Sequence, residues 1–342
     1  MIPLDDLDYI NSYPGINWDD LKNKKILITG FTGFFGEWLT AGLIYSNIQR
    51  NLDLQLFLIS RSSKIAFNHI KRDYVLKTKI EIINGDISSL RAFPICDLVF
   101  HLAASSDSRD YTFNRRRSFE TLVCGSYNLV SSYSQHENKC RILNVSSGSY
   151  YGAQGFKSKG IEESALPNML EIRSPFGLYS FGKISSELVG DIFSEEFNHL
   201  EVINVRGFAF IGPLLPLDKH FAIGNFINDV LNNRDTHLKS DGQAYRSYLY
   251  SADLVVALLL IILKGKNRES YNLGSPIGYS IIEIAKKVHR IGNSNKKVIP
   301  SSSRETQPNN FYIPNIDKLK KIGFNSYFTL DDSISKTFKS YV

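Results

Sequence analysis

Long apolar runs are scarce in this sequence, and their scarcity limits the classes of protein to which it can belong. The longest run, residues 252–263, is interrupted by Asp253 and ends at Lys264. It is too short to cross a bilayer and is typical of a buried helix. The first twenty residues have neither the basic start nor the apolar centre of a secretory signal. We therefore expect a cytoplasmic protein with no membrane partner.

Cysteine is also rare, with three residues in a chain of 342, at Cys96, Cys124 and Cys140. None of them lies in a CxxC pair or has the spacing of metal ligands. We interpret them as reduced core thiols and expect no metal site.

Dense basic clusters are few, although the net charge is +6. The one clear cluster, residues 115–117, begins a predicted helix and has neither interleaved aromatic residues nor a second cluster beside it. We interpret it as a solvated helix face and expect no nucleic-acid partner. A positive chain still suits small anionic ligands such as nucleotides and sugar diphosphates.

From Lys24 onward, short apolar runs alternate with longer helical stretches. This rhythm is typical of parallel strands whose connecting helices cover both faces of one sheet. The predicted strands are residues 25–29, 54–60, 80–84, 98–102, 141–146 and 202–206, and the predicted helices between them are residues 36–47, 115–134 and 179–197. The sequence thus predicts an α/β fold with a Rossmann-like, doubly wound parallel sheet.

The pattern loosens after residue 206, where Pro213 and Pro216 mark a loop. Further helices are predicted at residues 221–232, 254–263, 281–289 and 316–321. We expect residues 1–206 with 247–274 to form the domain that holds the sheet. Residues 207–246 with 275–342 should form a smaller C-terminal lobe.

Three glycines at three-residue spacing, Gly30, Gly33 and Gly36, lie between the first predicted strand and its helix. Glycine permits a tight turn and a close backbone approach, while the free N–H groups and the positive end of the helix receive a pyrophosphate. This strand–turn–helix context indicates a dinucleotide site. We predict that the glycines, with Phe34 and Phe35, bind the cofactor, which makes the sheet domain the dinucleotide-binding domain.

No acidic residue stands at the end of the second predicted strand, where Asp or Glu would hold the ribose diol of NAD. Arg61 stands there instead, between Ser60 and Ser62. A cation flanked by hydroxyls suits a ribose 2′-phosphate, so we favour NADP(H). NAD(H) remains the alternative, with Arg61 stacked on the adenine or directed to solvent.

Two more turns follow predicted strands at the same edge of the sheet, where the adenine and inner ribose would lie. Ordinary turn chemistry is the alternative interpretation of both. The residues expected to bind cofactor here are Asp86, Ile87, Leu102, Ala103 and Ala104.

A phenol and an ammonium lie one helical turn apart at Tyr179 and Lys183. The lysine charge, together with an oxidised nicotinamide, would lower the tyrosine pKa from its usual value of ~10 towards that of a general acid/base. Ser147 directly follows a predicted strand, at the edge where doubly wound sheets build their sites. We expect these three residues to be catalytic.

Taken in order, the motifs resemble the extended short-chain dehydrogenase/reductases, specifically the NAD-dependent epimerase/dehydratase family that acts on sugar nucleotides. The resemblance covers most of the chain and rests on Thr29-Gly30-x-x-Gly33-x-x-Gly36, Gly85-Asp86, His101-Leu-Ala-Ala104, Ser146-Ser147 before Tyr151-Gly152, and Tyr179-x-x-x-Lys183. It implies that Tyr179 is the acid/base on a sugar oxygen, that Ser147 hydrogen-bonds this oxygen, and that Lys183 also holds the nicotinamide ribose.

The resemblance further implies that the smaller lobe binds a sugar nucleotide. Downstream landmarks similar to those of the family are Gly212-Pro213, Gly242-x-x-x-Arg246-x-x-x-Tyr250-x-x-Asp253 and Asn272-x-Gly274. Arg246 and Arg304 could hold the substrate diphosphate by charge-assisted hydrogen bonds, or could form structural ion pairs. The expected substrate-binding residues are Ser147, Arg206, Asn225, Arg246 and Arg304.

Three reactions share this scaffold, namely 4-epimerisation, 4,6-dehydration and reduction of a keto sugar. Dehydratases of the family carry Asp-Glu after position 147 to eliminate water, whereas this chain has Gly148-Ser149. A reductase consumes reduced cofactor and commonly prefers NADPH, which agrees with Arg61. We expect a reductase of a nucleotide-linked 4-keto-6-deoxyhexose, such as a dTDP-4-dehydro-6-deoxyhexose, serving bacterial surface polysaccharide or O-antigen synthesis. A 4-epimerase is the alternative, and a non-catalytic NADP-binding protein belongs to another class.

Two departures from the family pattern concern the active site. Leu122 stands where the family usually has an asparagine, which removes the usual support of the site. The run Gly207-Phe208-Ala209-Phe210 replaces a more polar one and predicts an apolar sugar pocket. Family members commonly dimerise through two helices from each subunit, which correspond here to residues 115–134 and 179–197, so we expect a homodimer.

Overall fold

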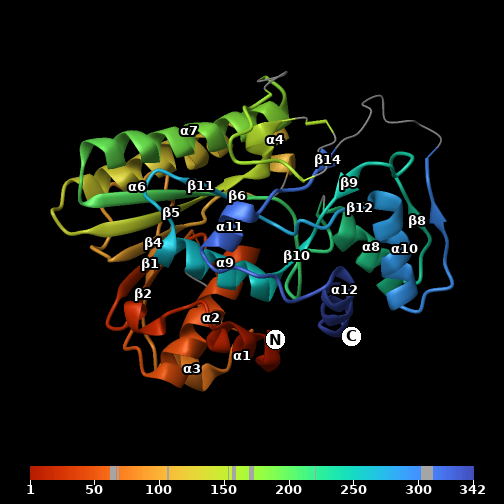
Figure 1. The fold of residues 1–342 in the computed structure, drawn as a ribbon, viewed down its shortest axis with the longest axis horizontal. Coiled ribbons are helices and arrows are strands. Elements are labelled where there is room, and N and C mark those ends of the chain that lie inside the picture. The colour runs from red at the N-terminus through yellow and green to blue at the C-terminus, as the bar shows by residue number, and fades with distance from the viewer. Residues whose placement is uncertain are drawn as a thin grey trace.

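The computed structural model describes residues 1–61, 67, 69–105, 108–152, 154–155, 159–168, 173–219, 221–301 and 311–342. Its centre is a seven-stranded parallel sheet, which confirms the predicted fold class (Figure 1). From one edge to the other, the strands are β11 (Ser270–Leu273), β6 (Leu200–Gly207), β5 (Cys140–Ser147), β4 (Leu98–His101), β1 (Lys25–Thr29), β2 (Gln55–Ser60) and β3 (Lys79–Asn84).

The order of the strands reverses at β1, which pairs in parallel with both β2 and β4. In an open parallel sheet, a ligand binds at such a point, beyond the carboxyl ends of the strands. The sequence predicted the first six strands and missed β11, which pairs with β6 at the edge of the sheet.

Alternate side chains of the buried strands enter two different cores, since successive residues of a strand point to opposite faces. Ile26 and Ile28 face the core formed with α1 (Leu4–Ser12), α2 (Phe34–Arg50) and α9 (Ser251–Lys264). Leu27 faces the core formed with α6 (Gly125–Ser134) and α7 (Pro175–Glu196), and Figure 1 shows these helices on the other side of the sheet.

The helix expected at residues 115–134 is built from three consecutive segments. These are α5 (Arg115–Phe119), the π-helical turn η2 (Glu120–Cys124) and α6. A π-helical turn inside a helix is often found at a functional site. Here the turn lies beside α7. A Cβ atom added to Gly182 of α7 would be only 2.6 Å from the Leu122 side chain. The residue that departs from the family pattern thus packs against the helix that carries Tyr179.

A smaller lobe has its own apolar core, formed by Ile223, Phe226, Ile284, Val288 and Ile334 with their neighbours. Its helices are α8 (Ala222–Leu231), α10 (Ile281–Ile291) and α12 (Leu330–Lys339). Helix α11 (Asp317–Lys321) does not join this core, since Leu319 packs into the main core. Part of the sequence that was predicted for the C-terminal lobe therefore packs on the main core.

The remaining elements are short. They are η1 (Trp18–Leu21), α3 (Arg72–Leu76), α4 (Ser108–Phe113), η3 (Gly148–Tyr151), β7 (Phe210–Ile211), β8 (Thr236–His237), β9 (Tyr245–Arg246), β10 (Leu249–Tyr250), β12 (Tyr279–Ser280), β13 (Val298–Ile299) and β14 (Phe311–Tyr312). Within the described residues, no helix is long and apolar enough to cross a membrane. The three cysteines are free thiols.

Candidate functional site

The glycine-rich turn has the close packing that its sequence predicted. Gly30 has a φ of +68°, and a Cβ atom there would lie 2.8 Å from the Cα of Ala103. A Cβ atom on Gly36 would lie 2.3 Å from the Cα of Phe31. Gly33 is the N-cap of α2 and has space around it, since the one atom close to an added Cβ is the Gly30 carbonyl oxygen at 3.3 Å. The backbone thus leaves room for a ligand at the positive end of α2.

A cavity of about 430 Å³ opens at this turn. It joins the ends of β1, β2, β3 and β4, where a doubly wound sheet holds a nucleotide. The predicted cofactor residues that line it are Gly30, Gly33, Arg61, Asp86, Ile87, Ala103 and Ala104. A partly polar cavity of this volume beside a helix N-terminus suits a nucleotide, so these residues could hold part of the nicotinamide cofactor.

The other predicted cofactor residues stand behind or beside this wall. The Phe35 ring packs edge-on against Phe210, with their centroids 4.7 Å apart. The backbone N–H of Leu102 donates to Thr29 Oγ1 over 3.1 Å, as does that of Ala103. Phe34 follows the Gly33 cap within the first turn of α2. These residues shape the turn, while the cavity wall itself comes from their neighbours.

Two arginines and a carboxylate line the cavity at the end where β2 and β3 stop. Arg117 is 3.5 Å from the carboxylate of Asp86, and the charge of Arg61 also acts on that group. Burial alone would raise the pKa of Asp86, but hydrogen bonds from Ser88 and the two guanidinium groups hold it below its ordinary value. Asp86 is therefore a carboxylate at neutral pH and keeps both cations at this end.

Two cations that line this cavity were not predicted from the sequence. Arg117 was interpreted as part of a solvated helix face. Its side chain is 61% exposed, but it reaches the cavity from α5. Lys219 reaches the same cavity from the loop before α8. The basic cluster itself was a signal for Arg117, whereas no local pattern marks Lys219.

Ser147 and Tyr179 lie together at the carboxyl end of β5, and Lys183 lies one helical turn beyond Tyr179. Ser147 is the last residue of β5, and its side chain hydrogen-bonds Tyr179. Helix α7 begins earlier than expected, at Pro175, because the Ser174 side chain accepts a hydrogen bond from the Gly177 N–H and caps it. Tyr179 thus lies inside the helix, where its backbone is fixed.

Burial dominates the ionisation of the two α7 groups. It lowers the pKa of Lys183 to about 8, although the charge of Glu187 acts in the opposite direction. The Lys183 ammonium donates to the carbonyl oxygen of Val145 over 2.6 Å. Burial raises the pKa of Tyr179, and the hydrogen bond with Ser147 opposes this rise. The lowering predicted from the sequence therefore depends on the positive charge of an oxidised nicotinamide.

A buried chain of hydrogen bonds supports the site at the point where the family usually has an asparagine. His101 lies 2.9 Å from Thr29 Oγ1 through Nδ1 and 3.0 Å from Ser126 Oγ through Nε2. The Ser126 hydroxyl donates to the Leu122 carbonyl oxygen over 2.7 Å, inside the π-helical turn. Burial, with a smaller effect of Lys183, lowers the pKa of His101 to about 3, so the imidazole is neutral.

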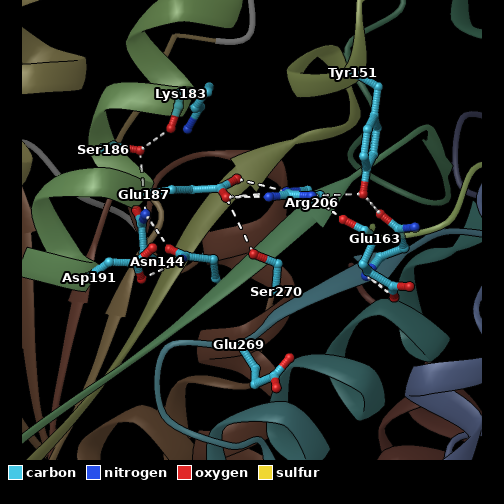
Figure 2. A network of polar contacts seen from close by, with 12 residues as sticks. Asn144, Tyr151, Glu163, Lys183, Ser186, Glu187, Asp191, Arg206, Glu269 and Ser270 are labelled. Carbon is cyan, nitrogen blue, oxygen red and sulfur yellow. Dashed lines mark hydrogen bonds and ion pairs between the residues drawn. The ribbon is translucent and has the colours of Figure 1, made fainter. Parts of the chain in front are cut away.

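Arg206 does not face the cavity, contrary to the expectation that it binds substrate. Its guanidinium is 2.8 Å from the carboxylate of Glu187 and also donates to the Tyr151 hydroxyl over 3.1 Å (Figure 2). It stacks on the Tyr150 ring at 3.4 Å. The side chains of the ion pair are 6% and 5% exposed. Its donors are used inside the protein, so Arg206 supports the turn after Ser147.

The other expected substrate residues are only partly brought together. Arg246 lies on β9 directly opposite Tyr312 of β14, with its guanidinium carbon 5.6 Å from the Tyr312 ring centroid. Asn225 lies in α8, in the smaller lobe. Arg304 lies outside the described residues. Phe208 packs on Tyr312 with their ring centroids 4.6 Å apart, at the place where an apolar pocket was expected.

Comparison with known proteins agrees with this geometry. A model described as the NAD dependent epimerase/dehydratase family matches residues 26–274. The chain belongs to this family. It is 24% identical to UDP-glucuronic acid decarboxylase 1 of Xenopus tropicalis, over 96% of this chain and 75% of the relative. It is 25% identical to human dTDP-D-glucose 4,6-dehydratase, over 93% and 90% of the two chains.

Solved structures show the same fold. The UDP-N-acetylglucosamine 4-epimerase of Methanobrevibacter ruminantium, in complex with UDP-N-acetylmuramic acid, superposes with a TM-score of 0.79 at 22% identity. The match covers 94% of this chain and 98% of that chain. The family model confirms the expected family, and the named relatives are enzymes that act on sugar nucleotides.

Proposed function

We propose that this protein is an NADP(H)-dependent reductase of a nucleotide-linked 4-keto-6-deoxyhexose, such as a dTDP-4-dehydro-6-deoxyhexose. The observation that carries the proposal is that Ser147 and Tyr179 lie together, with Lys183 one helical turn away, at the edge of the sheet where β1 to β4 open into a cavity of about 430 Å³ lined by cations. Its product would enter surface-polysaccharide or O-antigen synthesis in the cytoplasm.

Three groups of the chain would serve the reduction. When bound, the nicotinamide cofactor supplies a hydride to C4 of the sugar. Tyr179 donates the proton to the C4 oxygen, and Ser147 holds that oxygen by a hydrogen bond. The Lys183 ammonium lies one turn from Tyr179, where it stabilises the phenolate that remains after proton transfer.

The choice of NADPH rests on Arg61 and its surroundings. Arg61 lines the cavity at the end of β2, where the adenosine ribose of a dinucleotide lies in this fold. A guanidinium binds a phosphate through two parallel hydrogen bonds and gains nothing comparable from a ribose hydroxyl. The nearby Arg117 adds a second positive charge to the same end.

Dehydration is disfavoured by the space around residue 148. A Cβ atom on Gly148 would lie 2.6 Å from the Tyr312 hydroxyl oxygen. An acidic side chain cannot enter this position while Tyr312 is in place. The extra acid and base that elimination of water requires are thus absent from the two positions that follow Ser147.

A sugar-nucleotide 4-epimerase is the second candidate, because the family is named for its use of NAD and the same three residues would serve epimerisation. The two reactions differ in their cofactor balance. Incubation with a panel of sugar nucleotides and NADPH, with the absorbance of reduced nicotinamide as readout, separates them. A reductase consumes one NADPH per sugar, whereas an epimerase interconverts two sugars with no net change.

A further inference from the structure

A third hydroxyl lies at the catalytic centre, from a part of the chain far from the other two. Tyr312 belongs to β14, which pairs with β9 so that Tyr312 lies opposite Arg246. Its ring packs on that of Phe208, the residue directly after β6, with the two ring centroids 4.6 Å apart. Burial raises the pKa of Tyr312, and a hydrogen bond with Ser147 opposes this rise, as it does for Tyr179.

The close approach of Tyr312 depends on the residue after Ser147. An added Cβ atom on Gly148 would lie 2.6 Å from the Tyr312 hydroxyl oxygen and 3.1 Å from the Phe208 ring. Gly148 does not have a positive φ, so its backbone conformation does not require glycine. The missing side chain therefore serves the approach of the phenol.

The hydrogen-bonding capacity of Ser147 restricts how these groups can be arranged. A serine hydroxyl has one proton to donate and two lone pairs that accept. The backbone N–H of Ser149 already donates to Ser147 Oγ over 3.1 Å. One lone pair and one proton remain for the two phenols, so one phenol donates to Ser147 and the other accepts from it.

The reaction decides between the two arrangements. If Tyr179 donated to Ser147, the proton that the sugar oxygen needs would point away from the sugar. If Tyr312 donates instead, both lone pairs of Ser147 are occupied and Ser147 can act only as a donor. Its one proton is then directed at Tyr179 in the empty site and at the reacting oxygen once the sugar is bound. The Tyr179 proton is then free for transfer, and the phenolate that results accepts a hydrogen bond from Ser147.

We propose that Tyr312 is a positioning residue that donates to Ser147 and thereby directs the serine proton towards Tyr179 in the empty site and towards the substrate oxygen once the sugar is bound. This inference rests on the proposed function in that Tyr179 must act as the proton donor. It holds for reduction and for epimerisation, since both move a proton at the same sugar oxygen.

A double-mutant cycle with Ser147 tests the proposal. Tyr312→Phe keeps the ring and should lower kcat roughly five- to tenfold, as expected for one hydrogen bond, with little change in KM. The same substitution in a Ser147→Ala background should have no further effect, because its target is gone. An equal loss in both backgrounds would overturn the proposal, as would full activity of Tyr312→Phe.

Tyr111 supplies the matched control. It is a buried tyrosine whose ring centroid is 4.8 Å from that of Tyr179, but its hydroxyl donates to the Ser105 carbonyl oxygen over 2.6 Å. Any loss of kcat in Tyr111→Phe should be independent of Ser147, so the double variant with Ser147→Ala should show the product of the two single losses. Gly148→Ala is the second variant, because it displaces the Tyr312 hydroxyl without removing it. It should reproduce the kcat loss of Tyr312→Phe.

A second readout separates failure of this inference from failure of the proposed function. The pKa of Tyr179 can be measured by ultraviolet titration of tyrosinate in protein saturated with NADP⁺. The Tyr179 signal is the part of the titration that is lost in Tyr179→Phe. Tyr312→Phe should raise the pKa of Tyr179 in the wild-type background and leave it unchanged in Ser147→Ala. If these pKa changes were found in a protein that is inactive on every sugar nucleotide, the reductase proposal would be rejected and the role of Tyr312 would stand. An unchanged pKa in the wild-type background would reject the inference alone.

Discussion

Arg206 and Glu187 form a buried ion pair, in which a guanidinium nitrogen is 2.8 Å from a carboxylate oxygen. Glu187 lies on α7, one helical turn beyond Lys183. Burial alone would lower the pKa of Arg206, but its hydrogen bonds to Glu187 raise it. Removing one partner of a buried pair leaves an uncompensated charge. We therefore expect Arg206→Met to lower the free energy of unfolding by about 3–5 kcal/mol, measured by urea denaturation.

An exposed pair gives the control for this prediction. Arg268 is 2.8 Å from Glu195, with side chains 44% and 66% exposed. Arg268→Met should lower the free energy of unfolding by no more than about 1 kcal/mol. Replacing both buried partners, as in Arg206→Met with Glu187→Leu, should restore part of the loss. If Arg206→Met instead kept full stability and raised the KM for the sugar nucleotide, Arg206 would be a substrate ligand after all.

Cofactor preference should be set at Arg61, whose guanidinium finds a phosphate partner in NADPH and none in NADH. We expect the wild-type protein to bind NADPH more tightly, and Arg61→Asp to weaken NADPH roughly 10- to 100-fold with a small effect on NADH. Titration by protein fluorescence measures both constants. Arg116→Asp makes the same change of charge on a side chain that is 92% exposed and should alter neither. Equal wild-type affinities would refute the role of Arg61.

The positions of the candidate catalytic residues could be read from local sequence patterns because each pattern is short range. The glycine turn, the end of β5 and the i, i+4 spacing of Tyr179 and Lys183 each depend on one strand or helix and its cap. Strand β11, Ser270–Leu273, was missed because Ser270 and Asn272 interrupt the apolar run that marks the other buried strands.

Long-range pairing explains the remaining differences. Tyr312 enters the site because β14 pairs with β9, which lies more than sixty residues earlier in the sequence. Arg206 was assigned to the substrate because, with Gly212-Pro213, it resembles a landmark of the family's substrate domain. Its partner Glu187 comes from α7, and only the packing of α7 on β6 shows that the charge is already matched.

A homodimer is expected from the outer face of α6 and α7. Tyr127, Phe181, Leu188 and Ile192 are 51%, 41%, 58% and 50% exposed there. The α7 residues follow helical spacing, so they form one apolar stripe that a second copy could cover. Light scattering at micromolar concentration should give the dimer mass. Leu188→Glu should give the monomer, whereas Leu76→Glu, 71% exposed on α3, should not. A monomeric wild-type protein would exclude this interface.

The low pKa of Lys183 should make activity and stability respond to pH in opposite directions. Burial lowers this pKa from 10.5 to about 8 in the folded protein. The ammonium is therefore lost above about pH 8, and kcat/KM should fall there. The folded state binds fewer protons than the unfolded state between the two values, so the contribution of Lys183 to the free energy of unfolding rises across that interval.

Two measurements check the prediction for Lys183. The pH profile of kcat/KM should show an alkaline limb near pH 8, and the rise in stability measured with urea should vanish in Lys183→Met. An alkaline limb close to the ordinary value of 10.5 would show that burial does not control this group.

Tyr179 should account for most of the turnover and for little of the cofactor binding. With a nucleotide-linked 4-keto-6-deoxyhexose, the wild-type protein should oxidise one NADPH per sugar reduced, with the hydride at C4 and the proton on the C4 oxygen. Tyr179→Phe removes the proton donor and keeps the ring that packs against Tyr111. General acid catalysis contributes about 10²–10⁴-fold, so kcat should fall by about that factor while the Kd for NADPH stays nearly constant.

The same variant separates the two candidate reactions. An epimerase would purify with cofactor bound and would interconvert two 4-hydroxy sugars without net NADPH oxidation. Tyr179→Phe would then lose this interconversion instead of a reduction. That result would reject the reductase and retain the roles of Ser147, Tyr179 and Lys183, because both reactions pass a proton between the phenol and the same oxygen.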